Sequence, residues 1–405
     1  MIGTVSATIE SSMNFLRKAA SAAQDALEET VKEEPIPTEK AAENTTDINA
    51  EEDFDAKSET VIPSMVRIFS GCMDSQTSAD VSDVSGFGLP ADSGPGGAGG
   101  ACTNALLRAI ATEEDNHLTW LELLDKMRSF LKEKEYTQVP QLSSSRKLDV
   151  MHEKYSPTNP TNHADSKRRA LLIGINYVGQ QGELRGCHND VLSIKSYLLK
   201  EGFEEFNMKV LLDDGSHDTP SAKNILEGFR WLVDDAEDSD SLFLHYSGHG
   251  GHTADESGDE KDGQDETIIP VDYQTAGQIT DDVLFEELVL PLPAGVQMTC
   301  LMDCCHSGTV LDLPYMIQAT EDMDAAGAEM QQNPGFSFEK LMKIGKKLYE
   351  LHSKGASKQE IATHAFKEIA PMMNDKKITG GLANLQALAS GKKDGGFGGF
   401  GGFKF

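Results

Sequence analysis

Two stretches of the chain end in residues that can carry out nucleophilic chemistry. Residues 242–251 are LFLHYSGHGG, and residues 299–308 are TCLMDCCHSG. Each begins as a short apolar run typical of a buried strand and ends in Gly, Ser, His and Cys, which cannot continue that strand. The candidate groups are His249 and Cys305, which are 56 residues apart, so only the fold can bring them together. This pattern indicates a Cys/His nucleophilic pair.

The pair is suited to attack on a carbonyl group. A cysteine attacks only as the thiolate, so it needs a neighbouring group that accepts its proton. Histidine is the usual choice because it titrates near neutral pH. His249 lies in a turn flanked by glycine, and the backbone N–H groups of Gly250 and Cys305 are candidates for an oxyanion hole.

Two other interpretations of these residues stay open. Buried Cys and His residues often serve only packing, and Cys300 is expected to belong to the core. A zinc site could also use Cys304, Cys305, His306 and His249. Adjacent Cys-Cys-His, however, lacks the spacing that is usual for tetrahedral zinc ligands.

The elements that must position these residues alternate between strand and helix. The expected strands are 167–176, 208–213, 241–247, 266–272 and 296–303, and the expected helices are 187–201, 221–236 and 281–289. This alternation predicts an α/β fold with a mostly parallel sheet that is covered on both faces. Sites in such folds collect at the carboxyl ends of the strands, which is where His249 and Cys305 lie.

A smaller unit precedes this alternating region. A strand is predicted at 65–70, and helices are predicted at 102–110 and 118–133. Residues 64–140 therefore form a strand-helix-helix unit, which needs a larger sheet to complete it. Residues 141–166 are rich in polar and turn residues and are interpreted as a connector between this unit and residues 167–315.

The two ends of the chain carry weaker signals. The sequence of residues 1–63 predicts an amphipathic helix followed by an acidic, disordered linker. Residues 316–405 predict a helical extension, with helices at 336–352 and 357–370, and a Gly/Phe-rich tail. The tail cannot bury a core, so we expect it to be disordered.

Composition narrows the classes of partner and compartment. The 405 residues carry a formal net charge of −30, which disfavours binding to nucleic acid. No run of about 18 apolar residues suggests a membrane span, and the N-terminus lacks the pattern of a secretory signal. The six cysteines are too few for a disulfide scaffold, so we expect a reducing compartment, the cytoplasm.

Four motifs together resemble those of the metacaspases, which are caspase-fold cysteine peptidases found outside animals. They are SGCMDSQTSADV at 70–81, LRGCHNDV at 184–191, HYSGHG at 245–250 and DCCHSG at 303–308. The resemblance covers residues 64–315 and implies a caspase-like three-layer α/β/α fold. In most metacaspases the p20 region precedes the p10 region. Here the p10-like region, 64–140, comes before the p20-like catalytic region, 167–315, which is similar to the type III arrangement.

The resemblance also implies roles for the candidate catalytic residues. His249 is the general base and Cys305 is the nucleophile, since the cysteine directly before HSG carries catalysis in the family. Cys304 stands where Ser is common. A disulfide between Cys304 and Cys305, or one that involves Cys300, is a possible redox switch.

A substrate pocket follows from the same resemblance. The matching positions are Cys187, Asp190, Ser247 and Asp303. Two carboxylates in a partly desolvated pocket favour a cation, so we expect cleavage after Arg or Lys and not after Asp. In the alternative interpretation, Asp190 caps a helix and Asp303 orients a histidine or backbone groups.

The resemblance further implies a calcium site. The positions that match the family's site are Asp265, Asp281, Asp282 and Asp312. Carboxylate oxygens suit a hard cation, although an acidic loop such as 255–265 is by itself usually just solvated. We expect Ca²⁺ to activate the protein by ordering the loops beside the cleft.

Together these observations predict a calcium-dependent cysteine endopeptidase that cleaves protein or peptide substrates after Arg or Lys. The alternatives are a catalytically silent caspase-fold scaffold and a calcium or redox sensor that acts by binding. We expect an active, monomeric single chain without nucleic-acid or membrane partners. Self-cleavage within 141–166 is conceivable but is not required.

Overall fold

A single large sheet organises the part of the chain that the structure describes. The computed structural model describes residues 54–72, 80–81, 84–90, 93–95, 97–113, 118–254, 264–305, 311, 313–317 and 328–336. Within these residues, eight strands form a sheet in the order β13-β12-β4-β1-β11-β7-β5-β6. The strands are β1 (Met65–Ser70), β4 (Gln141–Ser144), β5 (Arg168–Gly174), β6 (Met208–Leu212), β7 (Ser241–Ser247), β11 (Gln297–Asp303), β12 (Tyr315–Ile317) and β13 (Gln331–Gln332).

The sheet is mostly parallel. Strands β1, β11, β7, β5 and β6 pair in parallel, whereas β4, β12 and β13 pair antiparallel on the other side of β1. All seven residues of β7 are buried, as expected for a strand covered on both faces. Successive side chains alternate between the faces, so Phe243 packs in one core and Leu244 in the other.

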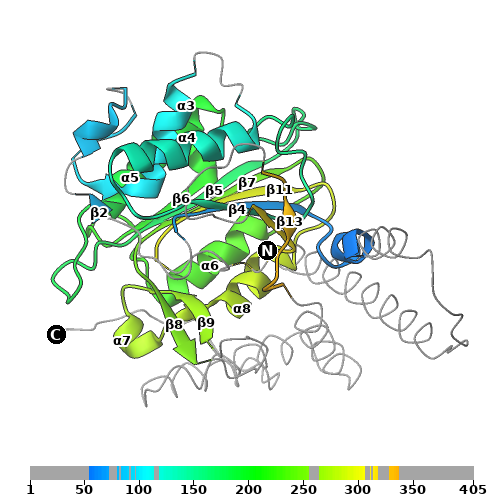
Figure 1. Ribbon diagram of the computed structural model, residues 1–405. Coiled ribbons are helices and arrows are strands. Elements are labelled where there is room, and N and C mark those ends of the chain that lie inside the picture. The colour runs from blue at the N-terminus through cyan, green and yellow to red at the C-terminus, as the bar shows by residue number, and fades with distance from the viewer. Residues whose placement is uncertain are drawn as a thin grey trace, which may run out of the picture.

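Helices cover both faces of the sheet (Figure 1). Helices α3 (Ala101–Ala111), α4 (Trp120–Glu133) and α5 (Cys187–Lys200) pack on one face, and α6 (Ala222–Val233) and α8 (Asp281–Leu284) pack on the other. Helix α8 continues into a π-helical turn, η3 (Phe285–Val289). The shorter elements are η1 (Val84–Phe87), η2 (Glu205–Asn207) and α7 (Tyr273–Ala276), and residues 54–61 are helical. The predicted three-layer α/β/α fold is confirmed.

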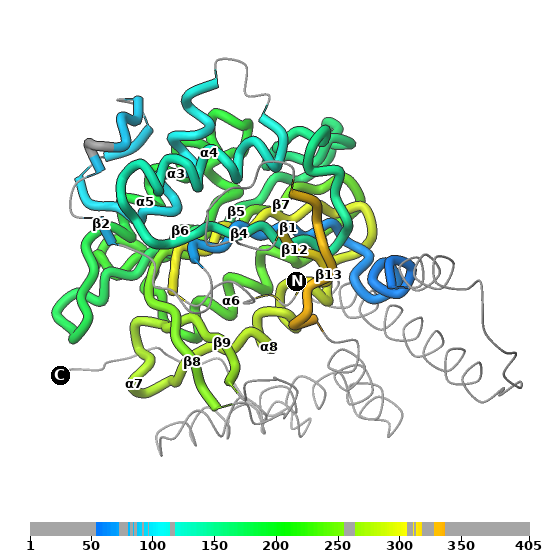
Figure 2. The backbone as a smooth tube through the Cα atoms, viewed as in Figure 1, coloured from blue at the N-terminus to red at the C-terminus, as the bar shows by residue number. Residues whose placement is uncertain are grey.

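The N-terminal unit completes the sheet of the catalytic region. Strand β1 pairs with β4 on one side and with β11 on the other. Figure 2 shows this blue strand lying among green and yellow strands that come much later in the chain. The capping box of α4, in which Thr119 and Glu122 exchange hydrogen bonds, fixes the start of the second helix of the unit.

The segment interpreted as a connector, 141–166, begins with a strand that the sequence analysis missed. Residues Gln141–Ser144 form β4, and all four of them are buried. Their sequence, QLSS, contains one apolar residue, so it gives no signal of strand periodicity. The strand forms because β1 and β12 supply backbone partners on both of its sides.

The strand expected at 266–272 forms, with shifted bounds, in a separate sheet. Strand β9 (Gln264–Ile268) pairs antiparallel with β8 (Gly250–Ala254) and β10 (Ile279–Thr280). This arrangement arises because β8 leaves the central sheet directly after His249, and β9 returns alongside it. A further pair, β2 (Asp80–Val81) and β3 (Gly99–Gly100), precedes α3.

Several expectations lie outside the described residues. They concern the N-terminal helix and linker up to residue 53, the acidic loop 255–263, the helices at 337–352 and 357–370, and the Gly/Phe tail. Among the described residues, no helix is long and apolar enough to cross a membrane.

Candidate active site

Two neighbouring parallel strands bring the candidate catalytic residues to one place. Strands β7 and β11 pair in register up to their last residues, Ser247 and Asp303. His249 and Cys305 each follow two residues later. The two segments are in close contact there, because a Cβ atom built on Gly250 would lie 1.9 Å from the carbonyl oxygen of Cys305. Only glycine can occupy this position without displacing the Cys305 backbone.

The orientation of the His249 ring is set by the loop that follows β5. Its Nε2 atom lies 2.6 Å from the carbonyl oxygen of Gly182, and its ring packs on Tyr177 with centroids 4.7 Å apart. The Tyr177 hydroxyl also accepts a hydrogen bond from the His249 N–H. A carbonyl oxygen can only accept, so Nε2 carries the proton and Nδ1 of the neutral ring keeps its lone pair. His249 can therefore act as a base through Nδ1.

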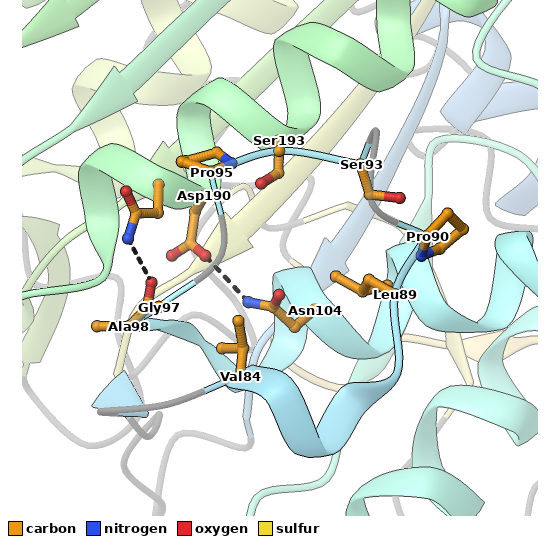
Figure 3. Close-up of a pocket in the computed structure, with 12 residues that line it drawn as sticks. Val84, Leu89, Pro90, Ser93, Pro95, Gly97, Ala98, Asn104, Asp190 and Ser193 are labelled. Carbon is orange, nitrogen blue, oxygen red and sulfur yellow. Dashed lines mark hydrogen bonds between the residues drawn. The ribbon is translucent and has the colours of Figure 1, made fainter.

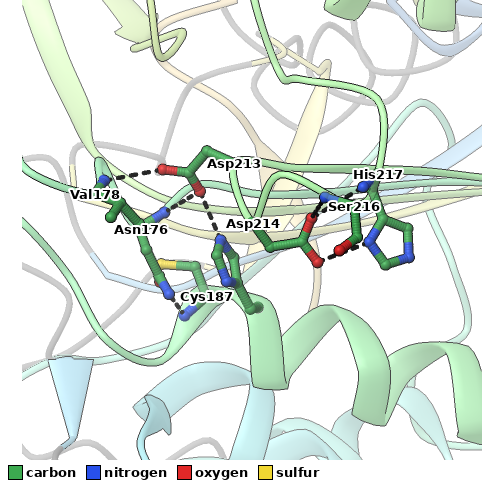
Figure 4. A network of polar contacts seen from close by, with 8 residues as sticks. Asn176, Val178, Cys187, Asp213, Asp214, Ser216 and His217 are labelled. Carbon is green, nitrogen blue, oxygen red and sulfur yellow. Dashed lines mark hydrogen bonds and ion pairs between the residues drawn. The ribbon is translucent and has the colours of Figure 1, made fainter.

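Asp213, directly after β6, holds this loop in place (Figure 4). Its carboxylate accepts hydrogen bonds from the N–H groups of Asn176 and Val178, at 2.8 and 3.0 Å, and lies 2.6 Å from His188 Nε2. Burial alone would raise the pKa of Asp213, but the hydrogen bonds from His188 and the two N–H groups lower it. Asp213 therefore stays ionised and anchors the loop that carries Gly182.

Burial distinguishes the two adjacent candidates for the nucleophile. Cys305 is partly exposed, whereas the other five cysteines, Cys304 and Cys300 included, are buried. Burial raises the pKa of the Cys300 thiol. The carbonyl oxygen of Cys304 lies 3.5 Å from the Cys72 sulfur, against the sheet. A redox role for Cys300 and Cys304 stays a prediction, and it would require local opening of the core.

The four predicted pocket residues come together beside this site. Cys187 and Asp190 lie at the start of α5, and Ser247 and Asp303 end β7 and β11. The Ser247 hydroxyl donates to Asp190 Oδ2 at 2.8 Å. Gly100 lies between the two carboxylates, since a Cβ atom on it would be 2.2 Å from Asp303 Oδ2 and 2.9 Å from Asp190 Oδ2.

The two carboxylates of this pocket are buried next to each other. Asp190 is 1% exposed and Asp303 is 4% exposed. Burial and the neighbouring Asp303 raise the pKa of Asp190 well above its usual range, although hydrogen bonds from Gly100 and Ser247 act in the opposite direction. Asp190 does not cap its own helix, because its partners are Gly100, Asn104 and Ser247. The alternative interpretation of Asp190 as a capping residue was wrong.

Helix α3, which the sequence analysis did not connect with the site, makes two contacts with the pocket carboxylates and a third with a buried histidine. Thr103, in the first turn of α3, donates its N–H to Asp303 Oδ2 at 2.8 Å. Its hydroxyl lies 3.2 Å from Nε2 of His245, a fully buried residue of β7. Asn104 donates to Asp190 Oδ1 at 3.1 Å. The glycines before α3 were the only available signal, because they permit this close approach.

The predicted calcium ligands lie on neighbouring elements of the small sheet. Asp265 is on β9, and Asp281 and Asp282 begin α8, directly after Thr280, which pairs with Thr267 of β9. Asp265 and Asp281 are buried. Asp312 lies outside the described residues, and those described contain no group of three or more His, Cys, Asp or Glu placed to hold a metal ion. The donors are hard oxygen ligands of the kind that Ca²⁺ prefers.

Comparisons with known proteins agree with this site. The chain is 46% identical over 298 residues to "Metacaspase III c" of Phaeodactylum tricornutum, an alignment that covers 72% of this chain and 86% of that protein. The chain belongs to the metacaspase family. A profile described as "Metacaspase, peptidase C14 domain" matches residues 168–314, and one described as "Caspase domain" matches residues 13–151. The predicted recognition, with the p10-like region before the p20-like region, is confirmed.

Other relatives match a smaller share of this metacaspase. "Metacaspase-1" of Mycosarcoma maydis is 53% identical over 152 residues, which are 37% of this chain and 38% of that protein. A crystal structure of a Geobacter sulfurreducens protein aligns with 25% identity and a TM-score of 0.29, covering 47% of this chain and 67% of the other. Membership of the family makes the protein a cysteine peptidase of the caspase fold.

Proposed function

We propose that this metacaspase is a calcium-dependent endopeptidase that cleaves after Arg or Lys, with Cys305 as nucleophile and His249 as general base. The observation that carries the specificity is the pair of buried carboxylates, Asp190 and Asp303, on either side of Gly100. The donors that meet Asp190 are all neutral, so none of them supplies a cation that would stabilise its ionised form. A guanidinium or ammonium group from a substrate would offset the cost of burying these charges.

The reaction follows from the orientation of the His249 ring. Nδ1 accepts the Cys305 proton, and the thiolate attacks the carbonyl carbon of the residue after which the chain is cut. The Gly182 carbonyl oxygen accepts a hydrogen bond from Nε2–H and so stabilises the imidazolium that forms. The oxyanion accepts hydrogen bonds from the N–H groups of Gly250 and Cys305. The imidazolium then protonates the leaving amine, and water deprotonated by His249 releases the acyl group from Cys305.

Fluorogenic peptides that differ only at the cleaved position test this proposal. We expect turnover of Arg and Lys peptides to exceed that of the Asp peptide by at least about 100-fold, because an Asp side chain would place a third carboxyl group beside Asp190 and Asp303. Faster cleavage of the Asp peptide would contradict the specificity. Equal turnover by the wild type and by Cys305→Ala would contradict the catalytic assignment and favour a scaffold or sensor.

The calcium requirement can be tested separately. Asp265, Asp281 and Asp282 would hold the ion together with Asp312, and Ca²⁺ would supply positive charge to these carboxylates. We expect a chelator to abolish peptide cleavage, and Ca²⁺ to raise the melting temperature of the wild type. Asp281→Ala should weaken both the activation by Ca²⁺ and the rise in melting temperature. Asp238→Ala, which changes a residue just before β7, should weaken neither. An unchanged calcium response in Asp281→Ala would overturn the site.

A further inference from the structure

We infer that Asn104, in the first turn of α3, is a positioning residue of the substrate pocket, which fixes Asp190 where this carboxylate meets a basic side chain. The inference rests on the proposed Arg/Lys specificity. It extends the pocket to a helix that lies outside the catalytic region in the chain.

The Asn104 amide is placed to orient the carboxylate. Its Nδ2 donates to Asp190 Oδ1 at 3.1 Å and to the Gly100 carbonyl oxygen at 2.8 Å, and the residue is 3% exposed. Figure 3 shows the amide pointing toward the carboxylate across the start of the helix. One side chain therefore links Asp190 to the turn that precedes α3.

That turn contacts both pocket carboxylates. The Gly100 N–H lies 2.9 and 2.8 Å from the two oxygens of Asp190, and the Thr103 N–H lies 2.8 Å from Asp303 Oδ2. By bonding the Gly100 carbonyl, Asn104 stabilises the backbone conformation that makes these contacts. Loss of the amide should therefore loosen Asp190 directly and, to a smaller degree, the turn beside Asp303.

The chemistry of an amide suits this role. Asparagine donates a hydrogen bond without carrying charge, so it orients Asp190 and adds no positive charge that would compete with the cation of the substrate. A lysine or arginine at this position would orient the carboxylate but would also neutralise it. Because these partners of Asp190 are neutral, the cation that stabilises the ionised carboxylate would come from the substrate.

The surroundings leave Asp190 room to move without this bond. Asp190 and Asn104 both border a cavity of about 390 Å³, which Val84 and Ser193 also line (Figure 3). A carboxylate beside an open space can rotate into it when one of its hydrogen bonds is removed. The hydrogen bond from Asn104 thus restricts rotation of the Asp190 carboxylate on the side that faces the cavity.

The test compares Arg with citrulline, its neutral isostere, at the cleaved position of a fluorogenic peptide. In Asn104→Leu, which replaces the amide with an apolar group of the same branching, we expect the Arg-to-citrulline ratio of kcat/KM to fall on the order of tenfold, mainly through a higher KM for Arg. Asn104→Ala, which leaves the helix intact, should show the same fall. Asn104→Gln should restore much of the ratio, since the cavity has room for one more methylene group.

Two readouts separate positioning from general damage. Alkylation of Cys305 by iodoacetamide does not use the pocket, so its rate should stay at the wild-type value in all three variants. Asn159→Leu removes another buried amide, beside Ser241 at the amino end of β7, and should leave the Arg-to-citrulline ratio unchanged even where it lowers the melting temperature.

The pH profile provides a third readout. Loss of a hydrogen bond to the ionised form raises a carboxylate pKa, so the acid limb of kcat/KM for the Arg peptide should move to higher pH in Asn104→Leu. The other titratable groups that face Asp190 are Asp303, Asp80, Cys187 and Cys102, and the substitution leaves each of them in place.

The outcomes are distinguishable. If the wild type prefers Arg to citrulline and both Asn104→Leu and Asn104→Ala keep that preference, the inference about Asn104 is overturned and the proposed specificity stands. If the wild type itself shows no preference, the proposed specificity fails and this inference fails with it. A fall in the ratio with an unchanged alkylation rate supports the positioning role.

Discussion

Ser247 pairs with Asp303 in register across β7 and β11, so two strands that are far apart in the chain end at the same level of the sheet. This single pairing has two consequences. It places His249 and Cys305, two residues beyond each strand, in one location. It also places Ser247 and Asp303 themselves beside Asp190, so the candidate catalytic pair and the proposed substrate pocket share the same two strand ends.

The first prediction distinguishes the adjacent cysteines. Cys305→Ala should lower kcat/KM for an Arg peptide by at least about 1000-fold, because the neighbouring thiol, that of Cys304, is buried. Cys304→Ala should keep activity within about threefold, since it removes only a buried packing group. Measured turnover of the two purified variants checks this, and loss of activity in Cys304→Ala would reassign the nucleophile.

The second prediction concerns the close approach of Gly250 to Cys305. Gly250→Ala should reduce kcat by about 100-fold or more, because the new methyl group would collide with the Cys305 carbonyl oxygen and displace an oxyanion donor. Gly251→Ala is the matched control. Its Cβ atom would meet the movable end of Gln278 at 3.0 Å, so we expect near-normal kcat. Similar losses in both variants would count against the specific contact.

The third prediction concerns the loop that orients His249. Asp213→Asn should lower kcat by about 10- to 100-fold, because the weakened anchor lets Gly182 move away from the imidazole. Asp214→Asn is its neighbour and control. Asp214 bonds Ser216 and His217 within its own turn (Figure 4), so its loss should leave kcat unchanged. Equal kcat values for both variants would refute the anchoring role.

The fourth prediction concerns acid stability. Burial lowers the pKa of His245 to about 3, so between roughly pH 6.5 and 3 the unfolded chain binds a proton that the folded chain does not. Stability should therefore fall as pH falls through this window, by up to about 1.4 kcal/mol per pH unit from this residue.

Chemical unfolding at several pH values measures this slope. His245→Gln removes the titrating group and should flatten the slope, whereas His163→Gln, on the surface, should not. A slope that is identical in the wild type and in His245→Gln would show that His245 is protonated in the folded state or does not govern acid unfolding.

The elements with clear periodicity could be predicted, and those shaped by neighbours could not. The apolar runs that became β7 and β11 and the amphipathic helices α4 and α6 were identified within a few residues. Strand β4 was missed because its sequence is polar and its backbone partners come from β1 and β12. The separate sheet of β9 was missed because a short apolar run does not indicate which strand it will pair with.

The sequence by itself determined the chemistry of the site. The residue types of His249 and Cys305, and their positions after predicted strands, were enough to indicate a Cys/His nucleophilic pair, whereas the pocket residues Asp190 and Asp303 came from the resemblance of the motifs to the metacaspases. Those residues are informative because a strand that ends in reactive side chains delivers them to the edge of its sheet.

Only the tertiary structure decided how these groups are held. Three contacts hold them: the Gly182 carbonyl with the His249 ring, the Asp213 carboxylate with the Asn176 N–H, and the Asn104 amide with Asp190. They join residues that are 67, 37 and 86 positions apart in the chain. No local pattern encodes such contacts, because they depend on the order of strands in the sheet and on the helix that packs across their ends. The same order brings α3 and its Asn104 to the pocket.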